Sequence, residues 1–198
     1  MTTVDQPQVV LPADWVPGPE QGFWTYDDYA ALPDDGRSYE IVNGVLVMSP
    51  SPDGPHQDAV ARFTYHLLAH VEFSGLGKVR VAPFDVELSP QDVFQPDVLV
   101  VLNAHLDRVK EKKVVGAPDL VIEVASQSTA AYDRITKYEK YAKAGVQEFW
   151  IANAKARTVQ ISVLEAGQYR SLGVFHGLQT LPSRVIPDLP VSVEQFFA

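Results

Sequence analysis

Two short aliphatic runs carry an acidic side chain where a buried strand would normally place an apolar one. The first run reads PDVLVVL at residues 96–102, and the second reads DLVIEVA at residues 119–125. Both are rich in Val, Ile and Leu, which predicts strands inside a sheet. The acids are Asp97 and Glu123. An unpaired buried carboxylate is costly or takes up a proton, so both positions need an explanation.

Antiparallel pairing of the two runs would bring these acids to the same edge of the sheet. Asp97 lies near the start of one run, and Glu123 lies near the end of the other. Alternation along the second run places Glu123 on the same face as Val121 and Ala125. A divalent cation would supply the missing positive charge. Carboxylates with open water positions suit Mg²⁺, which binds few protein oxygens and often a phosphate.

A lysine and a third acid extend this candidate site. Lys137 lies about two turns into a helix predicted over residues 129–145, so its ammonium can reach back toward the sheet. A lysine in that position can orient a water nucleophile or stabilise charge that develops on phosphate. Glu40, in the run SYEIVNG, is another acid embedded in an apolar strand.

Each of these residues also has a purely structural interpretation. Asp97 can cap a strand or accept backbone hydrogen bonds, and Glu123 can face water at a sheet edge. Lys137 can pair with Asp133, four residues earlier, on a solvated helix face. The four residues taken together favour a functional site, because acids embedded in strands are uncommon.

Composition limits the classes of function. The chain has 198 residues, 46% of them hydrophobic and 21% charged, which suits one compact domain. Its net charge of -9 argues against tight non-specific binding of nucleic acid, which depends on Lys and Arg. It has no cysteine, so disulfides and thiolate zinc sites are excluded. No run is long enough to span a membrane and no signal peptide is present, so we expect a cytoplasmic protein.

The remaining elements predict an α/β (α+β) domain around one mixed sheet. Residues 1–22 are rich in proline and read as an extended arm, and residues 23–198 read as a single domain. A capping pair and a proline stop predict a short helix at residues 25–33. Asn43-Gly44 predicts a two-residue hairpin turn, and residues 56–73 predict an amphipathic helix. Strands are expected at residues 78–88 and in three runs after Gly145, a predicted helix terminator, and a short helix is expected at the C-terminus.

Several motifs together resemble the Uma-two family of the PD-(D/E)xK nuclease superfamily. The similarity covers most of the chain, from about residue 26 to about residue 168, in the same motif order. The motifs are YEIVNG, PHQDAV, QPDVLVV, PDLVIEVASQST and YDRITKYEKYAKAGVQEFWIAN. The resemblance implies a restriction-endonuclease-like fold, with a mixed central sheet flanked by helices and acids at one end that coordinate Mg²⁺.

The resemblance also implies roles for individual residues. Asp97 and Glu123 match the two metal-binding acids of the superfamily motif. Glu40 matches the early acid of the family, which is the usual third carboxylate of the metal site. The superfamily pattern places a lysine two positions after the second acid, where this chain has Ala125. Lys137 stands where this family carries the lysine instead.

Two further residues are candidates for positioning water or substrate. His56 matches a recurrent histidine at the start of the first long helix, and Gln95 directly precedes the Pro96-Asp97 pair. Under this hypothesis the protein is a Mg²⁺-dependent endonuclease acting on DNA, with Mn²⁺ as a substitute cofactor. By resemblance to enzymes of this fold, a homodimer is also expected.

The sequence leaves two other functions open. The acidic balance favours a non-catalytic interaction or regulatory module that retains the nuclease fold, and the same site could hydrolyse RNA or another phosphodiester. His66 and His70 have a metal-compatible spacing, but no Glu follows His66 as in zinc proteases. RVKEKK at residues 108–113 and the lysine-rich helix before Gly145 are the basic concentrations of the chain. We read both as solvated faces that are also candidates for contact with phosphates.

Overall fold

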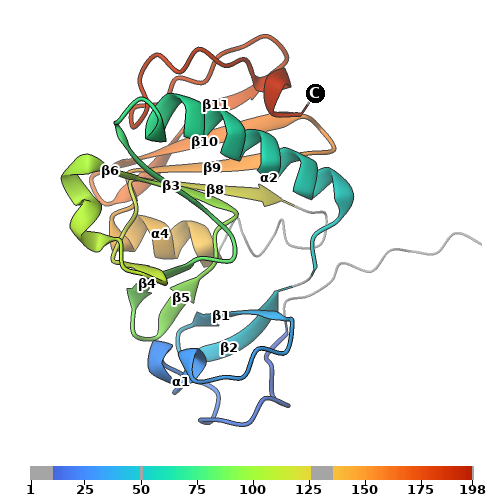
Figure 1. Ribbon diagram of the computed structural model, residues 1–198, viewed down its shortest axis with the longest axis vertical. Helices are drawn as coiled ribbons and strands as arrows, with labels where there is room; N and C mark the ends of the chain where they lie inside the picture. The colour runs from blue at the N-terminus through green and yellow to red at the C-terminus, as the bar shows by residue number, and fades with distance from the viewer. Residues whose placement is uncertain (1–10, 50, 126–135, 198) are drawn as a thin grey trace, which may run out of the picture.

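The computed structural model describes residues 11–49, 51–125 and 136–197 (Figure 1), and its strands lie in two mixed sheets. The five-stranded sheet, in the order β2-β1-β5-β4-β7, contains β1 (Ser38–Val42), β2 (Val45–Ser49), β4 (Asp85–Ser89), β5 (Asp92–Phe94) and β7 (Lys113–Val115). The six-stranded sheet, in the order β11-β10-β9-β8-β6-β3, contains β3 (Gly77–Val81), β6 (Val98–Leu102), β8 (Leu120–Ala125), β9 (Glu148–Asn153), β10 (Thr158–Glu165) and β11 (Gln168–His176).

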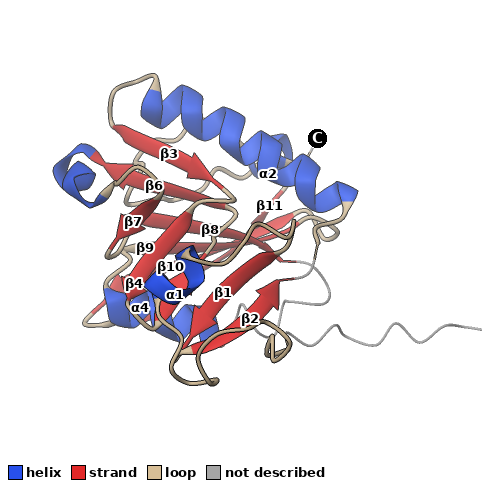
Figure 2. Cartoon of the chain, turned by 60° about the horizontal axis from the view of Figure 1, so that its bottom comes forward, coloured by secondary structure: helices blue, strands red, loops and turns tan. Residues whose placement is uncertain are grey.

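Helices lie around these sheets (Figure 2). They are α1 (Tyr26–Ala30), α2 (Gly54–Leu67), the π-helical turn η1 (Leu68–Glu72), the 3₁₀ segment η2 (Asn103–Arg108), α4 (Tyr138–Ala144) and the 3₁₀ turn η4 (Val193–Phe196). No helix among the described residues is both long and apolar enough to cross a membrane.

The mixed α/β class predicted from the sequence is confirmed. The strands, however, form two separate sheets and not the single mixed sheet that was expected. The division begins within the run predicted as a single strand at residues 78–88. Pro83 interrupts that run, and β3 joins the six-stranded sheet while β4 joins the five-stranded sheet. A proline has no N–H to donate to a strand ladder, which is the physical reason for the break.

Within the six-stranded sheet, the two acid-bearing runs pair as predicted. β6 and β8 are antiparallel, with Val98 opposite Ile122. Ile122 packs in the same core cluster as Phe63 of α2, whereas Val121 packs with Tyr141 of α4. The two helices therefore cover opposite faces of this sheet. The second cluster also includes residues of β1, β2 and β5, so it joins the two sheets.

The predicted hairpin and the predicted helix ends are confirmed. Asn43 and Gly44 connect β1 to β2 with positive φ angles of 51° and 74°, as a type I′ turn requires. Before α1, the Thr25 backbone N–H donates to the Asp28 carboxylate at 3.0 Å. α4 ends at Gly145, whose φ of 94° is left-handed. The first part of the helix predicted over residues 129–145 lies outside the described residues.

The described part of the predicted arm runs beside the hairpin. The Ala13 N–H donates to the Leu46 carbonyl at 2.8 Å, and the Gly44 carbonyl accepts from Gly22 and Trp24 at 2.8 and 3.0 Å. Trp24 is buried among residues of β1 and β2, but Trp15 remains 52% exposed. This segment thus holds one side of the β1–β2 hairpin, and Glu40 lies in β1 of that hairpin.

Candidate active site

Glu40 reaches the interior because it alternates with two core residues of β1. Tyr39 and Ile41, on either side of it, pack in the cluster around Trp24, so the Glu40 side chain projects to the opposite face of the strand. Glu40 is only 3% exposed. Its Oε1 accepts hydrogen bonds from the Gln95 backbone N–H at 3.0 Å and contacts the Lys137 Nζ at 2.9 Å.

Glu123 enters the same site from the other sheet. It lies in β8, on the face that Val121 and Ala125 present toward α4, and it is 4% exposed. Its Oε1 accepts hydrogen bonds from the Lys137 ammonium at 3.1 Å and from the Tyr141 hydroxyl at 3.0 Å. The two glutamates are therefore near neighbours, although they belong to different sheets.

Lys137 joins the two glutamates through a single buried ammonium. It directly precedes α4 and is 5% exposed. A buried charge is stable only when it is paired and hydrogen-bonded, and here each charged group has such a partner. The interpretation that Lys137 pairs with Asp133 concerns a residue outside the described ranges.

Asp97 lies beside this cluster with partners of its own. It immediately precedes β6, and the antiparallel register places it across from Glu123. Its Oδ2 accepts a hydrogen bond from the Val124 N–H at 2.7 Å and lies 3.1 Å from the His56 Nε2. Its side chain is 16% exposed. The structure thus places Asp97 next to the end of β8 that carries Glu123, at a more accessible position.

The position of His56 is fixed by the first turn of α2. The Asp53 side chain caps this helix by accepting a hydrogen bond from the His56 backbone N–H at 3.0 Å. Pro55 also lies in the first turn, where its missing N–H costs nothing. The helix start therefore directs the imidazole of His56 to the Asp97 carboxylate.

Gln95 contributes its backbone, not its side chain, to the cluster. While its N–H donates to Glu40, its Nε2 donates to the Tyr29 hydroxyl at 2.9 Å and to the Asp85 Oδ1 at 2.8 Å. Burial raises the pKa of Asp85, and burial next to Asp85 raises the pKa of Tyr29. Tyr29 thus stays protonated and anchors Gln95 from the side of α1.

Tyr141 is a residue of the site that sequence reasoning missed. Its ring packs against Phe94 and Phe149. Its hydroxyl, however, donates to Glu123. Burial, followed by the neighbouring Glu123 charge, holds the pKa of this phenol well above its ordinary value, so it stays a donor. The available signal was its spacing of four residues from Lys137.

The site has the donor chemistry for a divalent cation but not a closed ligand triad. Carboxylate oxygens are the ligands that Mg²⁺ prefers. Among residues 11–49, 51–125 and 136–197, however, no three acidic or histidine side chains have the spacing of a metal site. The Lys137 ammonium holds the position between Glu40 and Glu123. Glu40, Asp97 and Glu123 therefore match a metal site in ligand type but not in their present spacing.

Two lysines from the basic concentrations of the chain lie in ion pairs. Lys140 Nζ lies 2.7 Å from the Asp92 Oδ1, and Lys113 Nζ lies 2.6 Å from the Glu87 Oε2. Lys143 is exposed on α4. These contacts agree with solvated, locally neutralised faces more than with a continuous basic surface.

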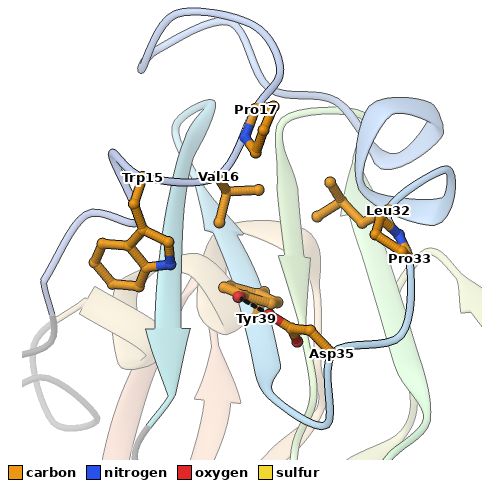
Figure 3. Close-up of a pocket in the computed structure, with 7 residues that line it drawn as sticks. All are labelled: Trp15, Val16, Pro17, Leu32, Pro33, Asp35 and Tyr39. Carbon is orange, nitrogen blue, oxygen red and sulfur yellow. Dashed lines mark hydrogen bonds between the residues drawn. The ribbon is translucent and has the colours of Figure 1, made fainter.

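A separate pocket of about 210 Å³ lies on the other side of β1 (Figure 3). It is lined by Trp15, Val16, Pro17, Leu32, Pro33, Asp35 and Tyr39. The Tyr39 hydroxyl donates to the Asp35 carboxylate at 2.7 Å. None of the predicted site residues lines this pocket, because Tyr39 and Glu40 project to opposite faces of the strand.

Comparisons with known proteins place this geometry in context. The family model described as "Uma2: Putative restriction endonuclease" matches residues 26–194. None of the curated proteins matches the chain. A solved structure, described as a putative nuclease belonging to DUF820 from Anabaena variabilis ATCC 29413, is similar with a TM-score of 0.70 and 19% identity. The similarity covers 87% of this chain and 97% of that one, and it shows a shared fold.

Proposed function

The chain belongs to the Uma2 family of putative restriction endonucleases, and from this premise we propose that it is a metal-dependent endonuclease that hydrolyses phosphodiester bonds in DNA. This membership confirms the family expected from the sequence motifs. The observation that carries the proposal is the convergence of Glu40 and Glu123, from two different sheets, on the buried Lys137. A protein that needed these positions only for packing would be more stable with apolar side chains there.

The carboxylates in this proposal have a shared role. Glu40, Asp97 and Glu123 would hold Mg²⁺, with Mn²⁺ as a substitute. When bound, the metal would polarise a phosphate oxygen and lower the pKa of a bound water. The hydrogen bonds from Gln95 to Glu40 and from Val124 to Asp97 orient the carboxylates before any cation arrives.

Lys137 has a distinct role in this proposal. Its ammonium carries three N–H donors on a flexible stem, so it can orient a water and place positive charge beside a phosphate. Its position at the start of α4 fixes the base of the side chain. His56, beside Asp97, would position water or substrate at the more accessible side of the site.

The rest of the chain has a place in the same proposal. Residues 23–198 would form the nuclease-like domain, with residues 1–22 as an arm. A homodimer would present two such sites to the two strands of a DNA duplex. Long-range electrostatic attraction would contribute little to DNA binding, because the net charge of the protein is -9.

A non-catalytic interaction or regulatory module is the second candidate. Two observations favour it: the acidic net charge, and the Lys137 ammonium that forms an ion pair with both Glu40 and Glu123 without a metal. Metal binding separates the two candidates. A thermal shift with millimolar Mg²⁺ or Mn²⁺ that disappears in Glu123→Ala supports the enzyme, and no shift in the wild type supports the module.

Plasmid cleavage tests the proposed reaction. With Mg²⁺, the wild type should nick or linearise supercoiled DNA, whereas Asp97→Ala and Lys137→Ala should each be slower by about a hundredfold or more. Lys143→Ala is the matched control, because Lys143 is an exposed lysine of α4 outside the site. Even a lost phosphate contact at this position should cost far less than a hundredfold in activity. Thermal denaturation of each variant checks that it is folded.

Two results would contradict this proposal. One is full activity in both Asp97→Ala and Lys137→Ala, which would remove these residues from the reaction. The other is a wild type that cleaves no DNA, RNA or other phosphodiester in a panel of substrates with Mg²⁺ and Mn²⁺. Cleavage of RNA but not DNA would keep the site and change the substrate.

A further inference from the structure

The Tyr141 hydroxyl makes a specific contact in the interior. Tyr141 lies in α4 and has no exposed surface. Its hydroxyl donates to the Oε1 of Glu123 at 3.0 Å, and the same oxygen accepts a hydrogen bond from Lys137 at 3.1 Å. One carboxylate oxygen is thus held by two donors that are four residues apart in the sequence.

The ring of Tyr141 is itself fixed by aromatic neighbours. Its centroid lies 5.4 Å from that of Phe94 and 5.3 Å from that of Phe149, at tilts of 53° and 50°. These neighbours come from β5 of one sheet and β9 of the other. The hydroxyl therefore has a defined position that does not depend on Glu123.

Two nearby tyrosines make a different kind of hydrogen bond. The Tyr138 hydroxyl donates to the backbone carbonyl of Tyr169 at 3.3 Å, and the Tyr169 hydroxyl donates to that of Val146 at 3.0 Å. These bonds satisfy a polar atom within the fold. Tyr141, in contrast, donates to the carboxylate of a candidate metal ligand, although it belongs to the same aromatic group.

We infer that Tyr141 is a positioning residue, which orients the Glu123 carboxylate for its role in the site through the hydroxyl–Oε1 hydrogen bond. This inference deepens the proposed function and rests on it. Groups that orient a metal ligand typically change metal affinity or activity by tenfold to a hundredfold when they are removed. A residue with a purely structural role would change stability alone.

The test compares Tyr141→Phe with Tyr138→Phe. Each change removes one hydroxyl from the same helix and keeps the ring, so both variants should fold. The dissociation constant for Mn²⁺ is measured by calorimetry, and crystal structures of both variants are determined in EDTA. We expect Tyr141→Phe to bind Mn²⁺ at least about tenfold more weakly and to show a displaced Glu123 carboxylate. Tyr138→Phe should match the wild type in both measurements.

The metal-free structure keeps this inference separate from the proposed function. If the wild type does not bind Mn²⁺, the proposed function fails, and the position of Glu123 alone decides the inference. A Glu123 carboxylate that stays in place in Tyr141→Phe would overturn the inference. So would an unchanged dissociation constant in Tyr141→Phe when the wild type does bind Mn²⁺.

Discussion

At the residue scale, the site depends on the charge of Lys137. Glu40 and Glu123 are almost fully buried, and each contacts this ammonium. Two buried carboxylates that face each other without a cation repel one another and lose their hydration. The ammonium thus reduces this repulsion in the absence of metal, and a divalent cation would reduce it further.

Replacing Lys137 with methionine should reveal this effect. Without metal, Lys137→Met should lower the free energy of unfolding by about 3–5 kcal/mol, because two buried carboxylates lose a shared cationic partner. Mn²⁺ should restore more stability to this variant than it adds to the wild type, although cleavage is lost. Urea unfolding in EDTA and in Mn²⁺ measures both effects.

A variant at an exposed lysine controls this experiment. Lys143→Met makes the same chemical change in α4 outside the site and should leave both unfolding curves unchanged. If Lys137→Met were as stable as the wild type in EDTA and indifferent to Mn²⁺, Lys137 would not be the counter-charge of the glutamates.

Individual acidic residues of the site were the features most easily predicted from the sequence. An acid such as Glu40 or Glu123 within an apolar strand is conspicuous, because alternation predicts which face it occupies. The contact of Tyr141 could not be predicted in the same way. An aromatic residue at helical spacing shows the same sequence pattern whether or not its hydroxyl binds a site residue. Gln95 was predicted to position water or substrate, and its side chain binds Tyr29 and Asp85 in the structure.

At the element scale, the β1–β2 hairpin presents Glu40 to the site. Its turn was predictable, because Asn43-Gly44 matches the positive φ angles of a type I′ turn. β5 and β7 were not predicted, because strands of three residues are too short to show a period. The boundary between β3 and β4 was also missed, although Pro83 marks it.

The hairpin turn has a steric requirement that can be measured. A Cβ at Gly44 would lie 2.3 Å from the Gly22 carbonyl oxygen, in addition to the strain of a φ of 74°. Gly44→Ala should therefore lower the free energy of unfolding by more than the roughly 1–2 kcal/mol expected from φ alone. Urea denaturation of the variant measures this loss.

Gly36→Ala is the matched control for this prediction. Gly36 has a φ of 75°, and nothing lies within 4 Å of a Cβ built there. The free energy of unfolding of Gly36→Ala should therefore fall only by the amount that a positive φ costs an alanine. Equal losses in the two variants would mean that the close approach of Gly22 to the turn does not constrain the hairpin.

At the scale of the whole molecule, the site forms where the two sheets meet. Glu40 comes from the five-stranded sheet and Glu123 from the six-stranded sheet, and Lys137 arrives from the segment before α4. The second core cluster, which includes Phe94, Val121 and Tyr141, packs beneath this junction. The site thus depends on the docking of the sheets and cannot form in either one alone.

This docking is also the part of the fold that the sequence did not predict. Local patterns give strands, turns and helix ends, because their causes lie within a few residues. Which sheet a strand joins depends on contacts between distant segments, such as the hydrogen bond from Gln95 to Glu40. For the same reason, the sequence predicted that Asp97 and Glu123 would share an edge, but not that Glu40 would arrive from a second sheet.

A crystal structure of the wild type grown with millimolar Mn²⁺ and examined for anomalous scattering would locate the proposed metal. We expect an anomalous peak in contact with carboxylate oxygens of Glu40, Asp97 and Glu123, with the Lys137 ammonium displaced from its present position between the two glutamates. A map with no peak there, and with Lys137 still bound to both glutamates, would rule out metal binding by these three carboxylates.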